Sequence, residues 1–108
     1  MLELKISKKP KLICILRVKD EIDIIKKWIE NKLFVDIFCV VDNGSTDGTY
    51  EYLKSLNNVA ITRTFGFNEG RDCNLVLELA KAHNPEWILK LDADEFFEDK
   101  AVKVFLNY

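Results

Sequence analysis

Carboxylates occur at three places in the sequence where a short apolar run ends. Asp20 follows the first run, Asp42 follows the second, and Asp92 and Asp94 follow the fourth. In an open parallel sheet the carboxyl ends of the strands meet at one edge, which is where such sheets bind ligands. Carboxylates that converge there repel one another unless a cation or hydrogen-bond donors compensate. Oxygen ligands suit Mg²⁺ or Mn²⁺, which usually bridge to substrate phosphates, so the pattern indicates a site for a metal and a phosphate.

The sharpest acidic group is residues 92–95, with the sequence Asp-Ala-Asp-Glu. If this segment is extended, Asp92 and Asp94 point to the same side and can share a ligand. An Asp-x-Asp pattern is common by chance, and an acidic, solvated loop that caps the last helix would also explain it. Its position directly after the apolar run 87–91 favours the ligand-binding interpretation.

Residues 42–49 read as a turn that leads into a helix. Asparagine and glycine supply the turn, and Ser45, Thr46 or Asp47 is the expected N-cap. This pattern needs no function to explain it. In the functional interpretation, the Asp42 carboxylate accepts a hydrogen bond from the N–H of a nucleobase. The residues by themselves leave both interpretations open.

Apolar runs alternate with helix-period segments along the chain, which is typical of βα units on a parallel sheet. We predict an α/β fold in a single layered domain that spans residues 1–108. Asp20 is expected to cap the first helix, and Leu75, Leu79 and Ala82 are expected to form the buried face of the third. The expected strands cover residues 12–16, 37–41, 59–62 and 87–91, and the expected helices cover 22–29, 50–56, 69–82 and 101–108.

The composition excludes several classes of protein. Sixteen basic and eighteen acidic side chains give a net charge of -2, which excludes a nucleic-acid partner bound by general phosphate neutralisation. No apolar stretch is long enough for a transmembrane segment. Three cysteines without metal-ligand spacing indicate buried thiols in a reducing, cytoplasmic setting. A basic lead-in would add a weak, peripheral attraction to an anionic membrane surface; it consists of Lys5, Lys8, Lys9 and Lys11.

Five residues whose side chains could in principle bind a ligand or react are expected to have only structural roles. Trp28 and Trp87 belong to a helix face and a strand, so we assign them to packing. Cys14 and Cys39 lie inside apolar strands and are expected to be small core residues. His83 comes at the end of a predicted helix, where a histidine favourably caps the dipole.

Four segments together resemble the family 2 glycosyltransferases, which have the GT-A fold. Residues 41–49 (VDNGSTDGT) look like a loop of that family, and residues 87–97 (WILKLDADEFF) look like its DxD strand. Residues 16–21 resemble the end of its first strand, and residues 68–75 resemble the entry to its third helix. The resemblance implies a Rossmann-like nucleotide-binding half with a mainly parallel, four-stranded sheet of order 3-2-1-4 and helices on both faces.

For function, the resemblance implies transfer of a sugar from a nucleotide-diphosphate sugar, most simply a UDP-sugar, to an acceptor hydroxyl of a saccharide, lipid or protein. The implied cofactor is Mn²⁺ or Mg²⁺, which stabilises the diphosphate as a leaving group. Asp42 would contact the base, Asp92 the ribose, and Arg71 the diphosphate, whereas Cys73 stands where many relatives have an arginine. The implied nucleotide-binding residues are Arg17, Val18, Asp20, Asp42, Arg71 and Asp92, and the implied metal ligands are Asp94, Asp92 and Glu95.

No catalytic residue is identified in the sequence. In inverting family members a carboxylate base deprotonates the acceptor, and it lies well downstream of the DxD strand, so we expect it beyond residue 108. The chain is therefore expected to be the donor-binding part of a glycosyltransferase, truncated before the acceptor half. Apolar surface exposed by the missing half would favour a homodimer. The alternative is a catalytically incomplete fragment or structural remnant that acts as a nucleotide-binding or interaction module.

Two other α/β classes fit less well. A sugar-phosphate nucleotidyltransferase requires a glycine-rich loop after the first strand, and residues 17–21 contain no glycine. A receiver-type phosphoacceptor module requires an aspartate after the third strand, and residues 62–64 (Thr-Arg-Thr) contain none.

Overall fold

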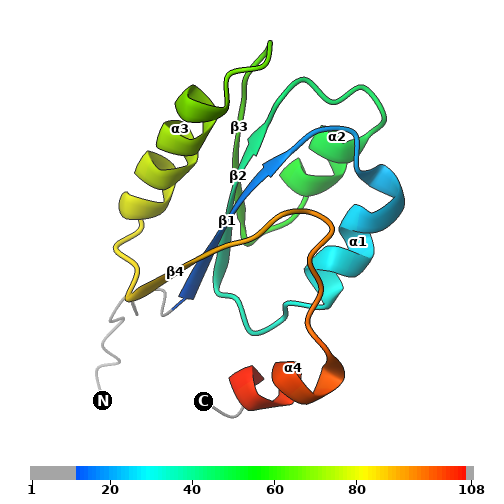
Figure 1. Ribbon diagram of the computed structural model, residues 1–108, viewed down its shortest axis with the longest axis vertical. Helices are drawn as coiled ribbons and strands as arrows, with labels where there is room; N and C mark the ends of the chain where they lie inside the picture. Colours follow the sequence, from blue (N-terminus) through cyan, green and yellow to red (C-terminus); the bar gives the residue numbers. More distant parts are fainter. Residues whose placement is uncertain (1–11, 107–108) are drawn as a thin grey trace, which may run out of the picture.

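The computed structural model describes residues 12–106, in which strands and helices alternate along the chain. The strands are all parallel and form one sheet in the order β3-β2-β1-β4 (Figure 1). The predicted α/β fold and strand order are therefore confirmed. The strands are β1 (Leu12–Val18), β2 (Ile37–Asp42), β3 (Val59–Arg63) and β4 (Trp87–Lys90). The helices are α1 (Ile22–Glu30), α2 (Thr49–Lys54), α3 (Glu69–Lys81) and α4 (Asp99–Leu106).

Helices cover both faces of the sheet, with α1 and α2 on one face and α3 on the other (Figure 1). Successive strand side chains point to opposite faces, so β1 and β2 contribute to both cores. This is why both strands read as continuous apolar runs. The core on the α1 side contains Cys14, Leu16, Val18, Ile25, Trp28, Ile29, Phe38, Val40 and Leu53. The core on the α3 side contains Ile13, Ile15, Cys39, Val41, Val76 and Ala80.

The buried face of α3 differs from the prediction. Asp72, Val76 and Ala80 are buried, whereas Leu75 is 39% exposed. Leu79 packs only partly against the core, and Ala82 lies beyond the last residue of the helix. The prediction followed the leucines, but the buried face is centred on residues spaced four apart that include a carboxylate. A buried aspartate on the core face conceals the apolar periodicity that sequence reasoning relies on.

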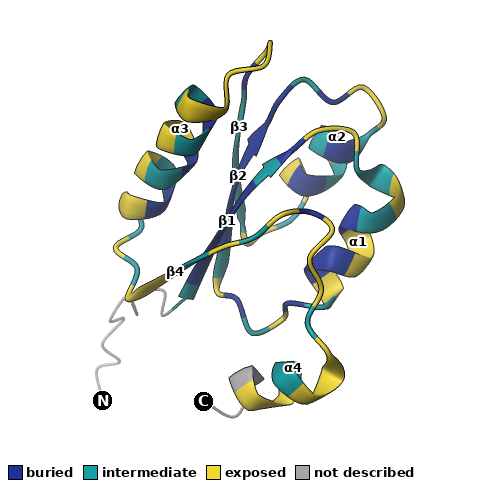
Figure 2. Cartoon of the chain, viewed as in Figure 1, coloured by how far each residue is buried: buried dark blue, intermediate teal, exposed yellow. Residues whose placement is uncertain are grey.

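Of the two tryptophans, only Trp28 packs as predicted. Trp28 is completely buried in α1 and its rings lie 5.6 Å from the ring of Phe38, centroid to centroid. Trp87 is 64% exposed, so its assignment to packing is wrong. It lies at the start of β4, which is an edge strand with mostly exposed side chains (Figure 2). An edge strand has a neighbour on one side only, which leaves its side chains less covered.

Cys14 and Cys39 are core residues, as predicted, and both thiols are free. Burial raises the pKa of Cys14 to about 12 and that of Cys39 to about 11. Both therefore stay protonated and unreactive at neutral pH. His83 follows the end of α3, and its Nδ1 lies 2.9 Å from the Leu79 carbonyl oxygen, consistent with the predicted capping role.

Within residues 12–106 no helix is both long and apolar enough to cross a bilayer. The basic lead-in of Lys5, Lys8, Lys9 and Lys11 lies outside the described residues, as do positions 107–108 of the last predicted helix.

The contrast between the two tryptophans gives a direct test of this packing. We expect W87F to remove the acrylamide-quenchable part of the fluorescence and to change the free energy of unfolding by less than about 0.5 kcal/mol. We expect W28F to keep the quenchable emission and to destabilise the fold by about 1–3 kcal/mol. The variant loses core volume and the hydrogen bond that Trp28 Nε1 donates to the Asp92 carbonyl. Quenching combined with urea unfolding checks both. Emission from W28F that resists quenching would contradict the exposed position of Trp87.

Candidate functional site

Parallel pairing brings the predicted carboxylates to the same edge of the sheet. Asp42 ends β2, where it pairs with Val18 of β1, and Asp20 follows β1. Asp92 follows β4, which pairs with the other side of β1. The convergence of these strand ends was predicted from the alternation of strands and helices, and the topology confirms it.

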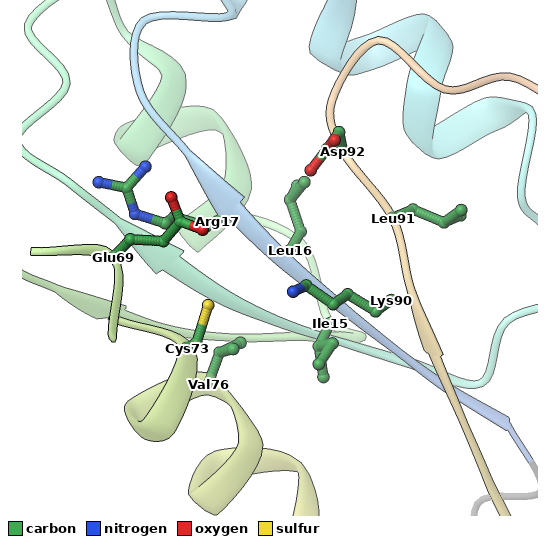
Figure 3. A pocket seen from close by; sticks show the side chains of 9 residues that line it. All are labelled: Ile15, Leu16, Arg17, Glu69, Cys73, Val76, Lys90, Leu91 and Asp92. Carbon is green, nitrogen blue, oxygen red and sulfur yellow. The ribbon is translucent and has the colours of Figure 1, made fainter. Parts of the chain in front are cut away.

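A pocket of about 240 Å³ opens between the carboxyl end of β1, the start of α3 and the end of β4 (Figure 3). Arg17 and Glu69 lie on one side of it, and Lys90 and Asp92 lie on the other (Figure 3). Its floor is apolar and its rim carries charges of both signs, which suits a polar, charged ligand. The lining residues are Ile15, Leu16, Arg17, Glu69, Cys73, Val76, Lys90, Leu91 and Asp92.

Arg17 is fixed by a buried carboxylate on α3. Its Nε donates to Asp72 Oδ2 at 2.8 Å, and Asp72 is completely buried, whereas the arginine side chain is 28% exposed. Burial by itself would raise the pKa of Asp72, but hydrogen bonds from Arg17, Thr64 and Arg71 outweigh it and keep that pKa below its ordinary value. Asp72 therefore stays ionised and orients Arg17 beside the pocket.

Asp72 also binds two residues outside β1. Arg71 Nε lies 3.1 Å from Asp72 Oδ1, and Asn43 Nδ2 donates to Asp72 Oδ2 at 3.1 Å. Asp72 thus joins α3 to the ends of β1 and β2. Sequence reasoning missed this residue. The only signal for it was an acidic residue four positions before the buried Val76, on the same helical face.

Arg71 does not line the pocket. Its guanidinium donates to the Phe65 and Gly66 carbonyl oxygens at 3.2 and 3.0 Å in the loop between β3 and α3. With these bonds and the one to Asp72, the Arg71 side chain stabilises that loop. Val18 also lies away from the pocket, because its side chain is buried in the core on the α1 side. The binding roles that the resemblance implied for Arg71 and Val18 stay predictions.

Asp42 is completely buried at the end of β2. Its Oδ1 accepts a hydrogen bond from Ser45 N at 2.8 Å and lies 3.5 Å from Arg63 Nε. Its Oδ2 has no hydrogen-bond partner among the described residues. The Arg63 guanidinium lies over the rings of Tyr50 and Phe65, with 4.5 and 5.5 Å to their centroids. An unpaired, buried carboxylate oxygen is costly and calls for a donor from elsewhere.

Asp20 joins two loops and is not the N-cap of α1, which corrects the prediction. Its backbone is left-handed, with φ of 51°, and its Oδ1 accepts from Thr46 N at 2.7 Å. Residue 21 occupies the N-cap position without a side-chain bond, and Asp47 Oδ2 accepts from Ile22 N at 3.1 Å instead. The first amide of α1 therefore donates to a side chain from the loop after β2, which local sequence cannot show.

The N-cap of α2 also differs from the prediction. Gly48, with φ of 100°, occupies the N-cap position, rather than Ser45, Thr46 or Asp47. Asp47 Oδ1 nevertheless accepts from Thr49 N at 3.0 Å, so this side chain serves the first amide of α2 without being the cap residue. Glycine is favoured there because a positive φ strains residues with a Cβ atom.

Residues 92–95 form a turn, where the prediction considered an extended segment. Glu95 N donates to the Asp92 carbonyl at 3.1 Å, and Asp92 N donates to Glu95 Oε1 at 2.7 Å. Ala93 is buried, whereas Asp92 and Asp94 are exposed and form no ion pair within the described part of the chain. No three His, Cys, Asp or Glu side chains of residues 12–106 are grouped as metal ligands. The turn therefore offers two accessible carboxylates, and one oxygen of Glu95 is already used.

The end of α1 lies behind this turn. Trp28 Nε1 donates to the Asp92 carbonyl at 2.9 Å, and the ammonium of Lys32 donates to the Glu95 carbonyl at 2.8 Å. Lys32 is completely buried. Burial lowers its pKa to about 8, although the neighbouring Cys14 and Glu95 oppose this shift. Sequence reasoning missed Lys32, because a single lysine after an amphipathic helix normally lies on the surface.

The family model for glycosyl transferase family 2 matches residues 18–108 of the chain. That range includes all the strand ends that form the edge described above. No curated protein matches the chain significantly.

The depressed pKa of Asp72 predicts how stability depends on acid. A carboxyl with a folded-state pKa below its unfolded value stabilises the fold above the ordinary pKa of 3.8, and this contribution is lost as the pH falls through the folded value. We expect D72N to lose about 1–3 kcal/mol at pH 7 and to show a flatter loss of stability below pH 4. E78Q, an exposed change on the same helix, should keep the wild-type profile. Urea unfolding at several pH values checks this, and parallel acid profiles for D72N and the wild type would contradict it.

Proposed function

Because the chain belongs to glycosyl transferase family 2, we propose that it binds a nucleotide-diphosphate sugar, most simply a UDP-sugar, at the carboxyl edge of the sheet. Sugar transfer to an acceptor hydroxyl is the reaction this binding would serve. The observation that carries the proposal is the pocket at this edge, which is lined by Arg17 of β1 and by Asp92 of the turn after β4. Both residues were singled out from the sequence as nucleotide-binding, and one pocket accounts for both.

Arg17 suits the diphosphate. Asp72 uses its Nε, and the two terminal nitrogens donate no hydrogen bond within residues 12–106, so they are available for phosphate oxygens. Guanidinium groups bind phosphate by paired hydrogen bonds, and an arginine already oriented by a carboxylate loses less freedom on binding. Lys90, on the other side of the pocket, adds a second positive charge. Lys90 was not singled out from the sequence. Its charge would partly replace that of the arginine that many relatives have at the position of Cys73.

Asp42 suits the base. The N3–H of uracil is a hydrogen-bond donor, and Asp42 Oδ2 is a buried acceptor without a partner in the described chain. Since Asp42 is fully covered, a base reaches it only when a neighbouring side chain moves. Arg63 is the charged neighbour at 3.5 Å, and it is anchored to the Ser45 carbonyl. We assign Arg63 to the base end of the site on this contact.

The residues at the turn fit a divalent cation. Asp92 and Asp94 present exposed carboxylates on either side of a buried alanine, and Glu95 has one oxygen outside the turn hydrogen bond. Mg²⁺ is typically held by one or two carboxylates together with substrate phosphates, so a complete protein cage is not required. When bound, such an ion would neutralise charge on the departing diphosphate. Asp94 and Asp92 are the proposed ligands, with Glu95 as an additional one.

The donor sugar, the acceptor, the catalytic base, a homodimeric state and the cytoplasmic or peripheral membrane location stay predictions from the sequence. A module that binds nucleotide without transferring sugar is the alternative. It shares the donor site described here and differs only in whether transfer follows.

Titration of UDP with Mn²⁺ tests the metal site. We expect binding by calorimetry that chelation with EDTA abolishes, and we expect D94N to weaken it about 10-fold or more, because one metal ligand loses its charge. D23N, an exposed change in the first turn of α1, is the matched control and should bind as the wild type does. Equal affinity with and without Mn²⁺, or a D94N variant that binds with wild-type affinity, would contradict the proposed metal site.

The role of Asp42 predicts a change in base preference. The N3 of uracil donates a hydrogen bond, whereas that of cytosine accepts one, so an asparagine amide pairs with cytosine where a carboxylate cannot. We expect D42N to lower the ratio of UDP affinity to CDP affinity about 10-fold. The asparagine oxygen can still accept from Ser45 N, which preserves the turn. An unchanged ratio in a folded D42N protein would exclude Asp42 from base recognition.

A further inference from the structure

Three residues at the end of α1 or just after it bond the backbone of the acidic turn and of Phe97. Trp28 Nε1 donates to the Asp92 carbonyl at 2.9 Å, at the start of the turn. Lys32 Nζ donates to the Glu95 carbonyl at 2.8 Å, at its end. Asn31 then pairs with Phe97 in both directions, since its Nδ2 donates to the Phe97 carbonyl and its Oδ1 accepts from Phe97 N, both at 2.8 Å. The backbone on both sides of Asp94 is thus bonded to one helix end.

Lys32 occupies the centre of this contact. Its Nζ lies 4.2, 4.8 and 5.7 Å from the ring centroids of Trp28, Phe96 and Phe97. It also donates to the Asn31 Oδ1 and, at 3.4 Å, to the Trp28 carbonyl. The ammonium is therefore enclosed by three aromatic faces and three oxygen acceptors. The two phenylalanines that follow the acidic residues in the sequence supply two of these faces.

A buried ammonium is stable only while its partners stay in place. Removing a charge from water is costly, and both cation–π contacts and hydrogen bonds must offset that cost. Apart from those with Trp28 and Asn31, the contacts given above for Lys32 all come from residues 95–97. A displaced turn would leave the charge buried without those partners. Displacing the turn would therefore cost free energy, and Lys32 stabilises the one position in which its partners are in contact.

We propose that Lys32 is a positioning residue for the donor site, and that together with Trp28 and Asn31 it sets where the Asp92 and Asp94 carboxylates lie. This inference rests on the proposed function, since those carboxylates matter only if they bind the metal and nucleotide. Lys32 itself touches neither ligand. It acts through the backbone of the turn, from the face of the sheet opposite α3 and the pocket.

The test compares K32M with K27M in the full chain. Methionine keeps an unbranched apolar side chain in the buried site that follows α1, whereas Lys27 is exposed on α1 itself. We expect K32M to weaken Mn²⁺-dependent UDP binding about 10- to 100-fold, the range typical of residues that support metal ligands. K27M should bind as the wild type does. I13V, a core change on the α3 side, controls for destabilisation alone and should leave the affinity unchanged.

A second readout follows the turn without any ligand. In ¹⁵N NMR spectra, hydrogen exchange at the Glu95 and Phe97 amides and at the Trp28 indole should be faster in K32M, while the Ile25 and Ile29 amides stay protected. N31A should accelerate exchange at the Phe97 amide in the same way. These measurements need no nucleotide, so they separate this inference from the proposed function.

The outcomes are distinct. Wild-type exchange rates in K32M would overturn the positioning role, whatever the nucleotide data show. Faster exchange with unchanged UDP affinity would also overturn it, because Lys32 would then hold the turn without affecting the site. If the wild-type chain binds no UDP with Mn²⁺, the proposed donor site itself is wrong.

Discussion

The parallel pairing of β1 with β2 on one side and with β4 on the other is the constraint on which the rest of the molecule depends. Parallel strands need crossover connections, so every strand end at the carboxyl edge is followed by a loop that leads into a helix or a turn. Arg17, Asp42 and Asp92 are far apart in the sequence and reach one edge for this reason alone. The same crossovers cover both faces of the central strands, which leaves that edge as the open part of the sheet.

Two buried charges of opposite sign fix this edge, one from each face of the sheet. On the α3 side, Asp72 is ionised and orients Arg17 next to the pocket. On the α1 side, Lys32 is enclosed by rings and carbonyl oxygens and bonds the backbone of the acidic turn. Each charge is costly to bury, and partners from segments distant in the sequence supply part of the compensation, such as Arg17 for Asp72 and the Glu95 carbonyl for Lys32. Arg17 and the backbone of the acidic turn, which belong to the proposed site, are thus held in place without a ligand, and such preorganisation reduces the cost of binding.

The errors of sequence reasoning have a common physical origin. Leu75 was expected in the core because periodicity counts apolar residues, yet the buried face of α3 includes the carboxylate of Asp72. Trp87 was expected to pack because strands usually do, yet β4 is at the edge of the sheet. Asp20 was expected to cap α1, yet its carboxylate accepts a hydrogen bond from the backbone amide of Thr46, in the loop after β2. In each case the deciding partner comes from another segment of the chain.

The sequence by itself determined the alternation of strands and helices, the parallel sheet order through the family resemblance, and the acidic residues that follow the strands. Local propensity and apolar patterning are short-range properties, so they can be read from neighbouring residues. Only the tertiary structure decided which of those polar residues share a pocket, that Asp72 and Lys32 are buried, and that residues 92–95 turn back on themselves. Burial of a charge depends on whether partners from distant segments surround it, and that information exists only once the chain has folded.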